Sequence, residues 1–169
     1  IMLSEQLIEQ IPRLRRYAKA LCGPNSAQEP DDLVQDCLER ALIYQESWTP
    51  GTNLRAWLFT ILHNLYVNQW RHQRRGPEVL PWGTELEKSS AVPQDDGVEL
   101  AELERALSAL TPDHRAVLLL VVLEGMRYAE VAAVLNIPEG TVMSRLARAR
   151  EQLRRELYAA RVTHLRSIK

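Results

Sequence analysis

The chain has 169 residues, of which 46% are hydrophobic and 25% charged, with 7 Gly and 9 Pro. This composition excludes a generally disordered, fibrous or low-complexity chain, and it suits one medium domain or two small ones. Aromatic residues make up only 6% of the chain, which favours helices over sheets. The longest apolar run, 116–123, is shorter than the roughly 20 residues that span a bilayer, so we expect no membrane insertion.

Several kinds of chemistry are disfavoured by the cysteine, histidine and nucleophile patterns. Cys22 and Cys37 fall on apolar helical faces, where buried thiols are expected rather than a disulfide or a redox switch. The histidines and cysteines lack zinc-ligand spacing, so no metal or other cofactor is expected. No nucleophile with its base and no phosphate loop is visible, which predicts a protein that is not an enzyme and has no small-molecule substrate. No basic-then-apolar leader precedes Ser4, which predicts a cytoplasmic protein.

The net charge of −1 hides a segregation of sign along the chain. Segment 53–75 carries four Arg and no acid, and segment 140–169 carries eight basic residues against two Glu. Two acidic segments alternate with them: 29–46 has six acids and one Arg, and 77–104 has eight acids and one Lys. Two basic segments separated by acidic ones suggest two nucleic-acid surfaces, although solvated helix faces would give the same pattern.

Apolar periodicity in the first part of the chain predicts three amphipathic helices. The first runs from Leu3 to Leu21 and ends at the turn residues 23–26. The second opens at Pro30 with acids in its first turn, where they complement the helix dipole, and it ends near residues 44–46.

The third helix is predicted to begin after Asn53, which is placed to cap it. Its leucine stripe and Trp57 should belong to the core. A second stripe, of aromatic rings, is partly distinct from the leucines, which leaves it for an interdomain contact, a partner protein or single-stranded DNA. The members of this stripe are Phe59, His63, Tyr66 and Trp70.

Residues 76–97 lose the helical periodicity and are punctuated by Pro, Gly and Ser, which predicts a linker. A leucine-rich helix should follow. Thr111 and Pro112 then provide an N-cap and a first helical residue for the next helix. The run 116–123 is apolar all round and is expected to be the buried helix of a second domain, with Gly125 as its C-cap.

The last part of the chain is typical of a helix-turn-helix: a short helix over 128–135, a turn at 136–138, and an arginine-rich helix from Glu139. At 100° per residue, one narrow arc of this last helix should pack inward: Val142, Leu146, Ala149 and Leu153. The opposite arc holds Ser144, Arg148, Glu151 and Arg155. Arginines outnumber acids on the exposed part, which favours insertion into a phosphate-lined groove over a solvated surface helix.

The order of these parts resembles bacterial sigma factors of the extracytoplasmic-function type, which form group IV of the sigma-70 family. The motifs that carry the resemblance are DDLVQD at 31–36, NLRAWLF at 53–59 with Asn64, LTPDHR at 110–115, EGMRYAEVA at 124–132 and IPEGTVMSRLARAR at 137–150. The resemblance implies an all-α protein of two small helical domains joined by a flexible linker. It implies sigma region 2 at 2–75, the linker at 76–97, and sigma region 4 with its helix-turn-helix at 98–169.

The resemblance also implies three sets of site residues. Binding of core RNA polymerase would fall to the acidic second helix, through Asp32, Gln35, Asp36 and Arg40. Recognition and melting of the minus-ten element would fall to Trp48, Asn53, Asn64, Asn68, Arg71 and Arg74. Carboxamides suit this task because they read base edges without a buried charge. Recognition of the minus-thirty-five element would fall to Thr141, Met143, Ser144, Arg145, Arg148 and Arg150. Met143 departs from the basic residue that many members carry there, and a thioether makes no bidentate contact to guanine.

The function implied is that of an alternative sigma factor for a stress or envelope response, with core RNA polymerase, promoter DNA and an anti-sigma factor as partners. A sigma-like decoy that sequesters an anti-sigma factor without binding DNA is the main alternative. A conventional helix-turn-helix regulator that dimerises on a palindrome is a third, but it would need neither the acidic second helix nor the aromatic and asparagine-rich third helix.

Overall fold

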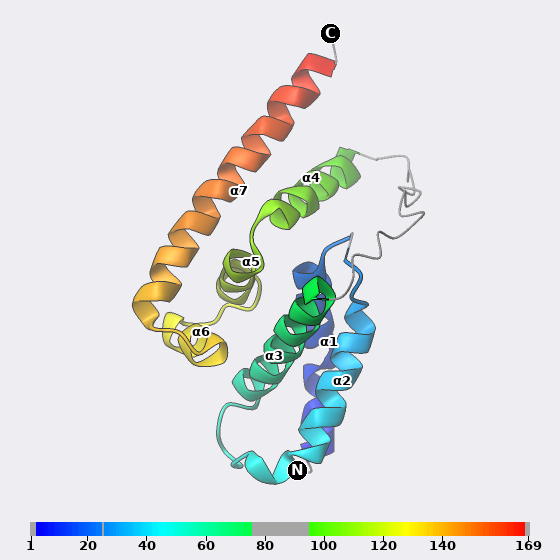
Figure 1. The fold of residues 1–169 in the computed structure, drawn as a ribbon, viewed down its shortest axis with the longest axis vertical. Coiled ribbons are helices and arrows are strands. Elements are labelled where there is room, and N and C mark those ends of the chain that lie inside the picture. The colour runs from blue at the N-terminus through cyan, green and yellow to red at the C-terminus, as the bar shows by residue number, and fades with distance from the viewer. Residues whose placement is uncertain (1–2, 25, 76–94, 168–169) are drawn as a thin grey trace.

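The computed structural model describes residues 3–24, 26–75 and 95–167, and within these ranges every regular element is a helix (Figure 1). Helices α1 (Leu3–Cys22), α2 (Pro30–Ile43) and α3 (Leu54–Arg75) pack against one another as a first domain, with the short 3-10 helix η1 (Gln45–Ser47) between the last two. Its core includes fully buried leucines from all three helices and an edge-to-face pair of Tyr17 and Phe59, whose ring centroids are 5.0 Å apart. The all-α prediction is confirmed.

A second domain is formed by α4 (Asp95–Ala109), α5 (Pro112–Leu118), the π-helical segment η2 (Leu119–Leu123), α6 (Tyr128–Leu135) and α7 (Glu139–Ser167). Helix α7 packs on α4, α5 and α6 through its first half, and its C-terminal part extends beyond the other helices (Figure 1). Asn136 ends α6 in the left-handed conformation, with a φ of 54°, and this sets the turn of the helix-turn-helix. The predicted helix-turn-helix is therefore present.

The caps expected from the sequence are in place. The side chain of Asn53 accepts a hydrogen bond from the amide of Ala56 at 3.1 Å, and that of Thr111 accepts one from the amide of His114 at 3.3 Å. Gly125 has a φ of 63°, a conformation that L side chains rarely adopt, as its predicted role after the apolar run requires. Local signals thus determine where α3, α5 and η2 begin or end.

Two predictions differ from the structure. Helix α4 begins at Asp95, inside the segment 76–97 predicted as a linker, because the acids at its start complement the helix dipole; the remaining linker residues, 76–94, lie outside the described ranges. The run 116–123 is not buried all round, since Val122 is 64% exposed. The chain changes there from α to π geometry, with the amide of Glu124 bonded to the carbonyl of Leu119, and the wider turn rotates Val122 outward.

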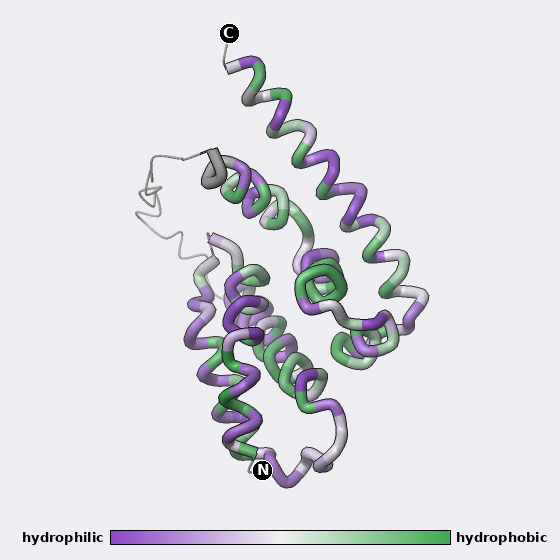
Figure 2. The backbone as a smooth tube through the Cα atoms, turned by 180° about the vertical axis from the view of Figure 1, so that it is seen from behind, coloured by the Kyte–Doolittle hydropathy of each residue, from purple (hydrophilic) through white to green (hydrophobic). Residues whose placement is uncertain are grey.

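The two domains pack against each other. Helix α6 lies on α3, and η2 lies on α1, so that the buried residues of both domains form one continuous cluster. Figure 2 shows the coil that contains the apolar run 116–123, which packs beside α1, with a mainly hydrophobic colour. This packing places the expected minus-ten surface of the first domain next to the helix-turn-helix of the second.

Candidate nucleic-acid interface

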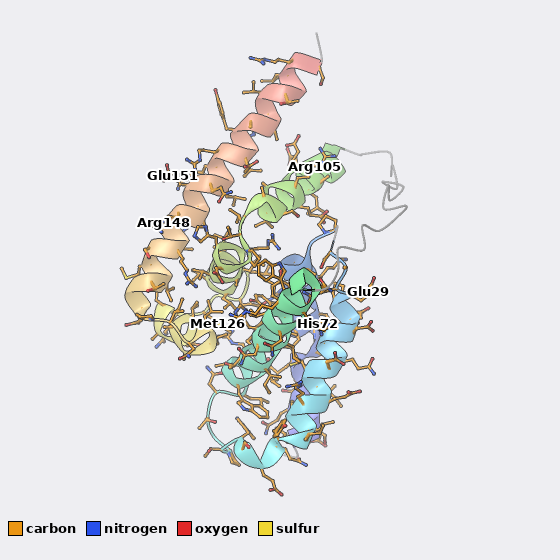
Figure 3. The ribbon with its side chains drawn as sticks, in the orientation of Figure 1. Glu29, His72, Arg105, Met126, Arg148 and Glu151 are labelled. Atoms are coloured by element: carbon orange, nitrogen blue, oxygen red, sulfur yellow. The ribbon has the colours of Figure 1, made fainter. Side chains whose placement is uncertain are left out.

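The recognition helix α7 is oriented by its buried arc, since Val142, Leu146 and Ala149 are at most 2% exposed. Figure 3 shows Arg148 and Glu151 on the side of α7 away from the first domain. Of the residues predicted to contact the minus-thirty-five element, four are exposed: Met143, Ser144, Arg148 and Arg150. The other two, Thr141 and Arg145, are half-buried. The helix thus presents cations to solvent where a DNA groove can reach them.

Helix α2 presents the residues predicted to bind core polymerase. Leu33, Val34 and Cys37 are buried and fix the rotation of the helix. The predicted set therefore lies on the outer side: Asp32, Gln35 and Arg40 are exposed and Asp36 is half-buried. The spacing of three, four and eight residues from Asp32 brings these side chains onto neighbouring turns of one surface.

Both cysteines are buried free thiols, as predicted. Burial raises the pKa of Cys22 to about 11 and that of Cys37 to about 12. The Cys37 thiol donates to the carbonyl of Leu58 at 3.4 Å. Both thiols therefore stay protonated at neutral pH and act as small core side chains.

The residues predicted to read the minus-ten element are only partly gathered. Asn64, Asn68 and Arg71 are exposed on α3, whereas the side chain of Arg74 lies outside the described part. Trp48 is half-buried beside Trp57, with ring centroids 6.4 Å apart. Trp57, predicted to be core, is itself half-buried and packs at the edge of the core.

Asn53 contacts the second domain. Its Nδ2 donates to Oε2 of Glu130 at 3.1 Å, and Nη2 of Arg55 donates to the same oxygen at 3.3 Å. Nη1 of Arg55 also donates to the backbone carbonyl of Glu124 at 3.1 Å. The side chain of Glu124 is 1% exposed and both its oxygens accept from Nη2 of Arg16 at 3.2 Å. These four side chains and Asn53 form an interdomain polar network.

Three of the four residues of the aromatic stripe of α3 are buried, and His63 and Tyr66 lie near charged groups of the second domain, whereas Phe59 packs on Tyr17 within the first domain and Trp70 is half-buried. Phe59, His63 and Tyr66 are at most 9% exposed, so in this arrangement they offer no stacking surface for single-stranded DNA. Burial lowers the pKa of His63 to about 4, with smaller opposing effects from Asp113 and Arg145 of the second domain. His63 is therefore neutral at physiological pH.

Buried Arg115 joins the ends of two helices. It donates to the carbonyls of Leu107, Ser108 and Leu110 around the end of α4, at 2.8, 3.1 and 2.8 Å. It also donates to the carbonyl of Leu21 near the end of α1, at 2.7 Å. Carbonyls at the last turn of a helix lack partners within the helix and carry the negative end of its dipole, so a guanidinium satisfies both needs.

A groove of about 930 Å³ opens between the domains. Its floor is apolar, with Ala20 from α1, Leu103 from α4, and Val122 from η2. Its charged lining residues are Arg16, Lys19, Glu104, Arg150 and Arg154, of which four are basic. Arg150, predicted to contact DNA, thus also lines this groove.

Sequence reasoning missed the network residues Arg16, Arg55, Glu124 and Glu130 and the role of Arg115. Their interdomain partners are 69 to 108 positions away along the chain, and no periodic pattern links them. The sequence signal nearest to them was the motif at 124–132, which contains both glutamates. Across the described ranges, no helix is long and apolar enough to cross a membrane, and no cluster of three or more candidate side chains could hold a metal ion.

Comparisons with known proteins find matches for both parts of the chain. Residues 100–153 match the family model of sigma-70 region 4, and residues 7–63 match that of the sigma2 domain of PhyR. The ECF RNA polymerase sigma factor EcfG of Rhodopseudomonas palustris is 39% identical over 156 residues, which are 92% of this chain and 85% of that protein.

Two solved structures also resemble the chain. The sigma factor RpoE of Bartonella quintana, in complex with the anti-sigma factor NepR, is 32% identical with a TM-score of 0.73, covering 92% of this chain and 96% of that one. CnrH, in complex with the cytosolic domain of CnrY, is 26% identical with a TM-score of 0.68, covering 92% and 87%. By the extent and identity of these matches, the chain belongs to the family of ECF RNA polymerase sigma factors.

Proposed function

We propose that this chain is a cytoplasmic group IV sigma factor that binds core RNA polymerase and directs it to the promoters of a stress or envelope response. Its first domain would act as sigma region 2 and its second as sigma region 4. The observation that carries the proposal is the exposed basic face of α7, where Arg148 stands free of the core on a helix-turn-helix. A protein that never touched DNA would have no need of this face.

The acidic outer side of α2 supports the polymerase part of the proposal. Asp32 and Asp36 lie one helical turn apart on a helix whose other side is buried, so they are available to a basic partner surface. The exposed amides of Asn64 and Asn68 support reading of unpaired bases, because a carboxamide both donates to and accepts from a base edge.

An anti-sigma factor is the third partner we propose, and the interdomain groove is its candidate site. An apolar floor with a mainly basic lining suits an amphipathic helix whose apolar stripe is flanked by acids. A helix seated there would contact Arg16 of the first domain and Arg150 of the second, and so hold both domains at once. RpoE and CnrH, which resemble this chain, were both solved in complexes, the former with an anti-sigma factor.

A decoy that only sequesters an anti-sigma factor is the second candidate function. The match of residues 7–63 to the sigma2 domain of PhyR favours it, since PhyR of Bartonella quintana is named an anti-anti-sigma factor. The two candidate functions differ in whether α7 binds DNA.

Run-off transcription with bacterial core polymerase on a promoter library separates the two candidates. The initiation factor should yield promoter-specific transcripts, Arg148→Ala should reduce them, and Arg161→Ala, an exposed arginine farther along α7, should not. A folded protein that yields no promoter-specific transcript would favour the decoy. Pull-down from the native host under uninduced conditions should recover a helical anti-sigma partner besides polymerase subunits.

A further inference from the structure

We propose that the chain closes on itself through two glutamates of the second domain, and that this closed state holds the side chain of Asn53, just before α3, away from DNA. The glutamates are Glu124 and Glu130, and the groups they hold are Arg16, Asn53 and Arg55 of the first domain. The inference rests on the proposed function in one respect, which is the role of Asn53 as a base-reading residue.

The first argument is that both functional atoms of the Asn53 side chain are engaged. Its Oδ1 accepts from the amide of Ala56 at 3.1 Å, and its Nδ2 donates to Glu130 at 3.1 Å. The first bond caps α3 and persists in any arrangement of the domains. The second crosses between domains and holds the amide against Glu130, so its loss frees the side chain to turn toward a base edge.

Opposite charges lie on the two sides of the contact between the domains. Both interdomain ion pairs among the described residues draw the cation from the first domain and the carboxylate from the second: Arg16 with Glu124 and Arg55 with Glu130. The cations belong to a domain that is proposed to meet a polyanion. The glutamates therefore occupy the groups that a DNA strand would otherwise attract, and closure and strand binding compete.

The carboxylate of Glu124 is enclosed at the contact between the domains. The side chain of Glu124 is 1% exposed, and those of Arg55 and Glu130 are 22% and 27% exposed. A carboxylate this enclosed is tolerated because Arg16 pairs with both of its oxygens. Opening the domains returns this carboxylate to water, which offsets part of the cost of separating the apolar surfaces that the two domains share.

The expected change in the ratio of open to closed molecules is of a size that suits a switch. Glu130 is partly exposed, so loss of its charge should raise the ratio of open to closed molecules by about threefold to tenfold. A shift of this size is enough to change the apparent affinity for a ligand that binds only the open form by the same factor, as long as the closed form predominates.

The test measures closure directly. Dyes are attached to cysteines introduced by Glu46→Cys and Arg161→Cys, both at exposed positions, while the native thiols are buried. Energy transfer in the free chain reports the distance between the domains. We expect Glu130→Gln and Arg55→Glu each to lengthen it, and the double swap Arg55→Glu with Glu130→Arg to restore it.

The matched control is Glu99→Gln, which makes the same change of charge in the second domain at an exposed position of α4. It should leave the interdomain distance unchanged. Circular dichroism melting confirms that each variant is folded before it is compared. Unchanged energy transfer in both Glu130→Gln and Arg55→Glu would overturn the proposal.

A second measurement tests whether closure keeps Asn53 from DNA. A random-sequence pool of single-stranded DNA should bind Glu130→Gln more tightly than the Glu99→Gln control by about the factor by which the open ratio rises. Equal affinities of the two variants, with the domains shown to open, would overturn the gating role. Failure of the proposed sigma-factor function would give a different result from failure of the closure proposal. Wild type and opened variants would then both give no run-off transcript, whatever the energy transfer between the dyes.

Discussion

Replacing Arg115 by Met should destabilise the protein by about 3–5 kcal/mol. The guanidinium is buried and donates four hydrogen bonds to backbone carbonyls, three of them at 2.8 Å or less. A hydrogen bond to a charged group contributes about 1.5–3 kcal/mol, and Met fills part of the volume while leaving all four acceptors unpaired. Water can reach some of these carbonyls after relaxation, which brings the loss below the simple product.

Urea unfolding followed by circular dichroism measures this loss. Arg105→Met is the matched control, because Arg105 lies exposed on α4 and its replacement should change stability by less than about 0.5 kcal/mol. Arg115→Lys should recover less than half of the loss, since an ammonium cannot span carbonyls that a planar fork reaches. A loss below about 1 kcal/mol for Arg115→Met would refute the view that this side chain caps α1 and α4.

Three further predictions concern single surfaces. Charge reversal of Asp32 and Asp36 should weaken binding to core polymerase in a pull-down without changing helicity, and unchanged affinity would remove α2 from the polymerase contact. Arg148→Ala should reduce binding to closed duplex promoter, whereas Asn53→Ala should slow strand opening; a promoter with a pre-melted minus-ten bubble should rescue only the Asn53 variant, and equal rescue of both would contradict the division. The pKa of His63, about 4 in the folded chain against an ordinary 6.5, means that protonation favours unfolding or opening. Stability should therefore be constant above about pH 6.5 and fall as the pH drops toward 4. In pH-dependent melts, His63→Gln should flatten this dependence of stability on pH. An equal dependence in both proteins would show that another group causes it.

Helix boundaries were predictable because their causes are local. The caps at Asn53 and Thr111 accept hydrogen bonds from amides three residues away, and Gly125 is favoured by the positive φ at its own position. The inward and outward arcs of α7 follow from the same short-range periodicity, and the structure places Val142 and Arg148 on the predicted sides. The assignment of the chain to a sigma factor family drew on such local motifs in their order.

The closed arrangement was not predictable from these signals. Glu124 reads as one more acid after an apolar run, yet it is buried because Arg16, 108 positions away, pairs with it. The aromatic stripe left three interpretations open, and only the packing of the second domain on α3 favours the interdomain one for His63. Val122 was wrongly predicted to be buried, because a change from α to π geometry rotates a residue around the helix and does not alter the apolar pattern of the sequence.

The direction of charge between the domains has a consequence for how ionic strength acts on this protein. Added salt screens the partly exposed pair of Arg55 with Glu130, and to a much smaller extent the enclosed pair of Arg16 with Glu124, which favours separation of the domains. The same salt weakens the attraction of arginines for phosphates. The two effects oppose each other in any titration that starts from the closed chain. The measured dependence of DNA affinity on salt is then shallower than the number of phosphate contacts alone would give, and counting contacts from that slope would undercount them.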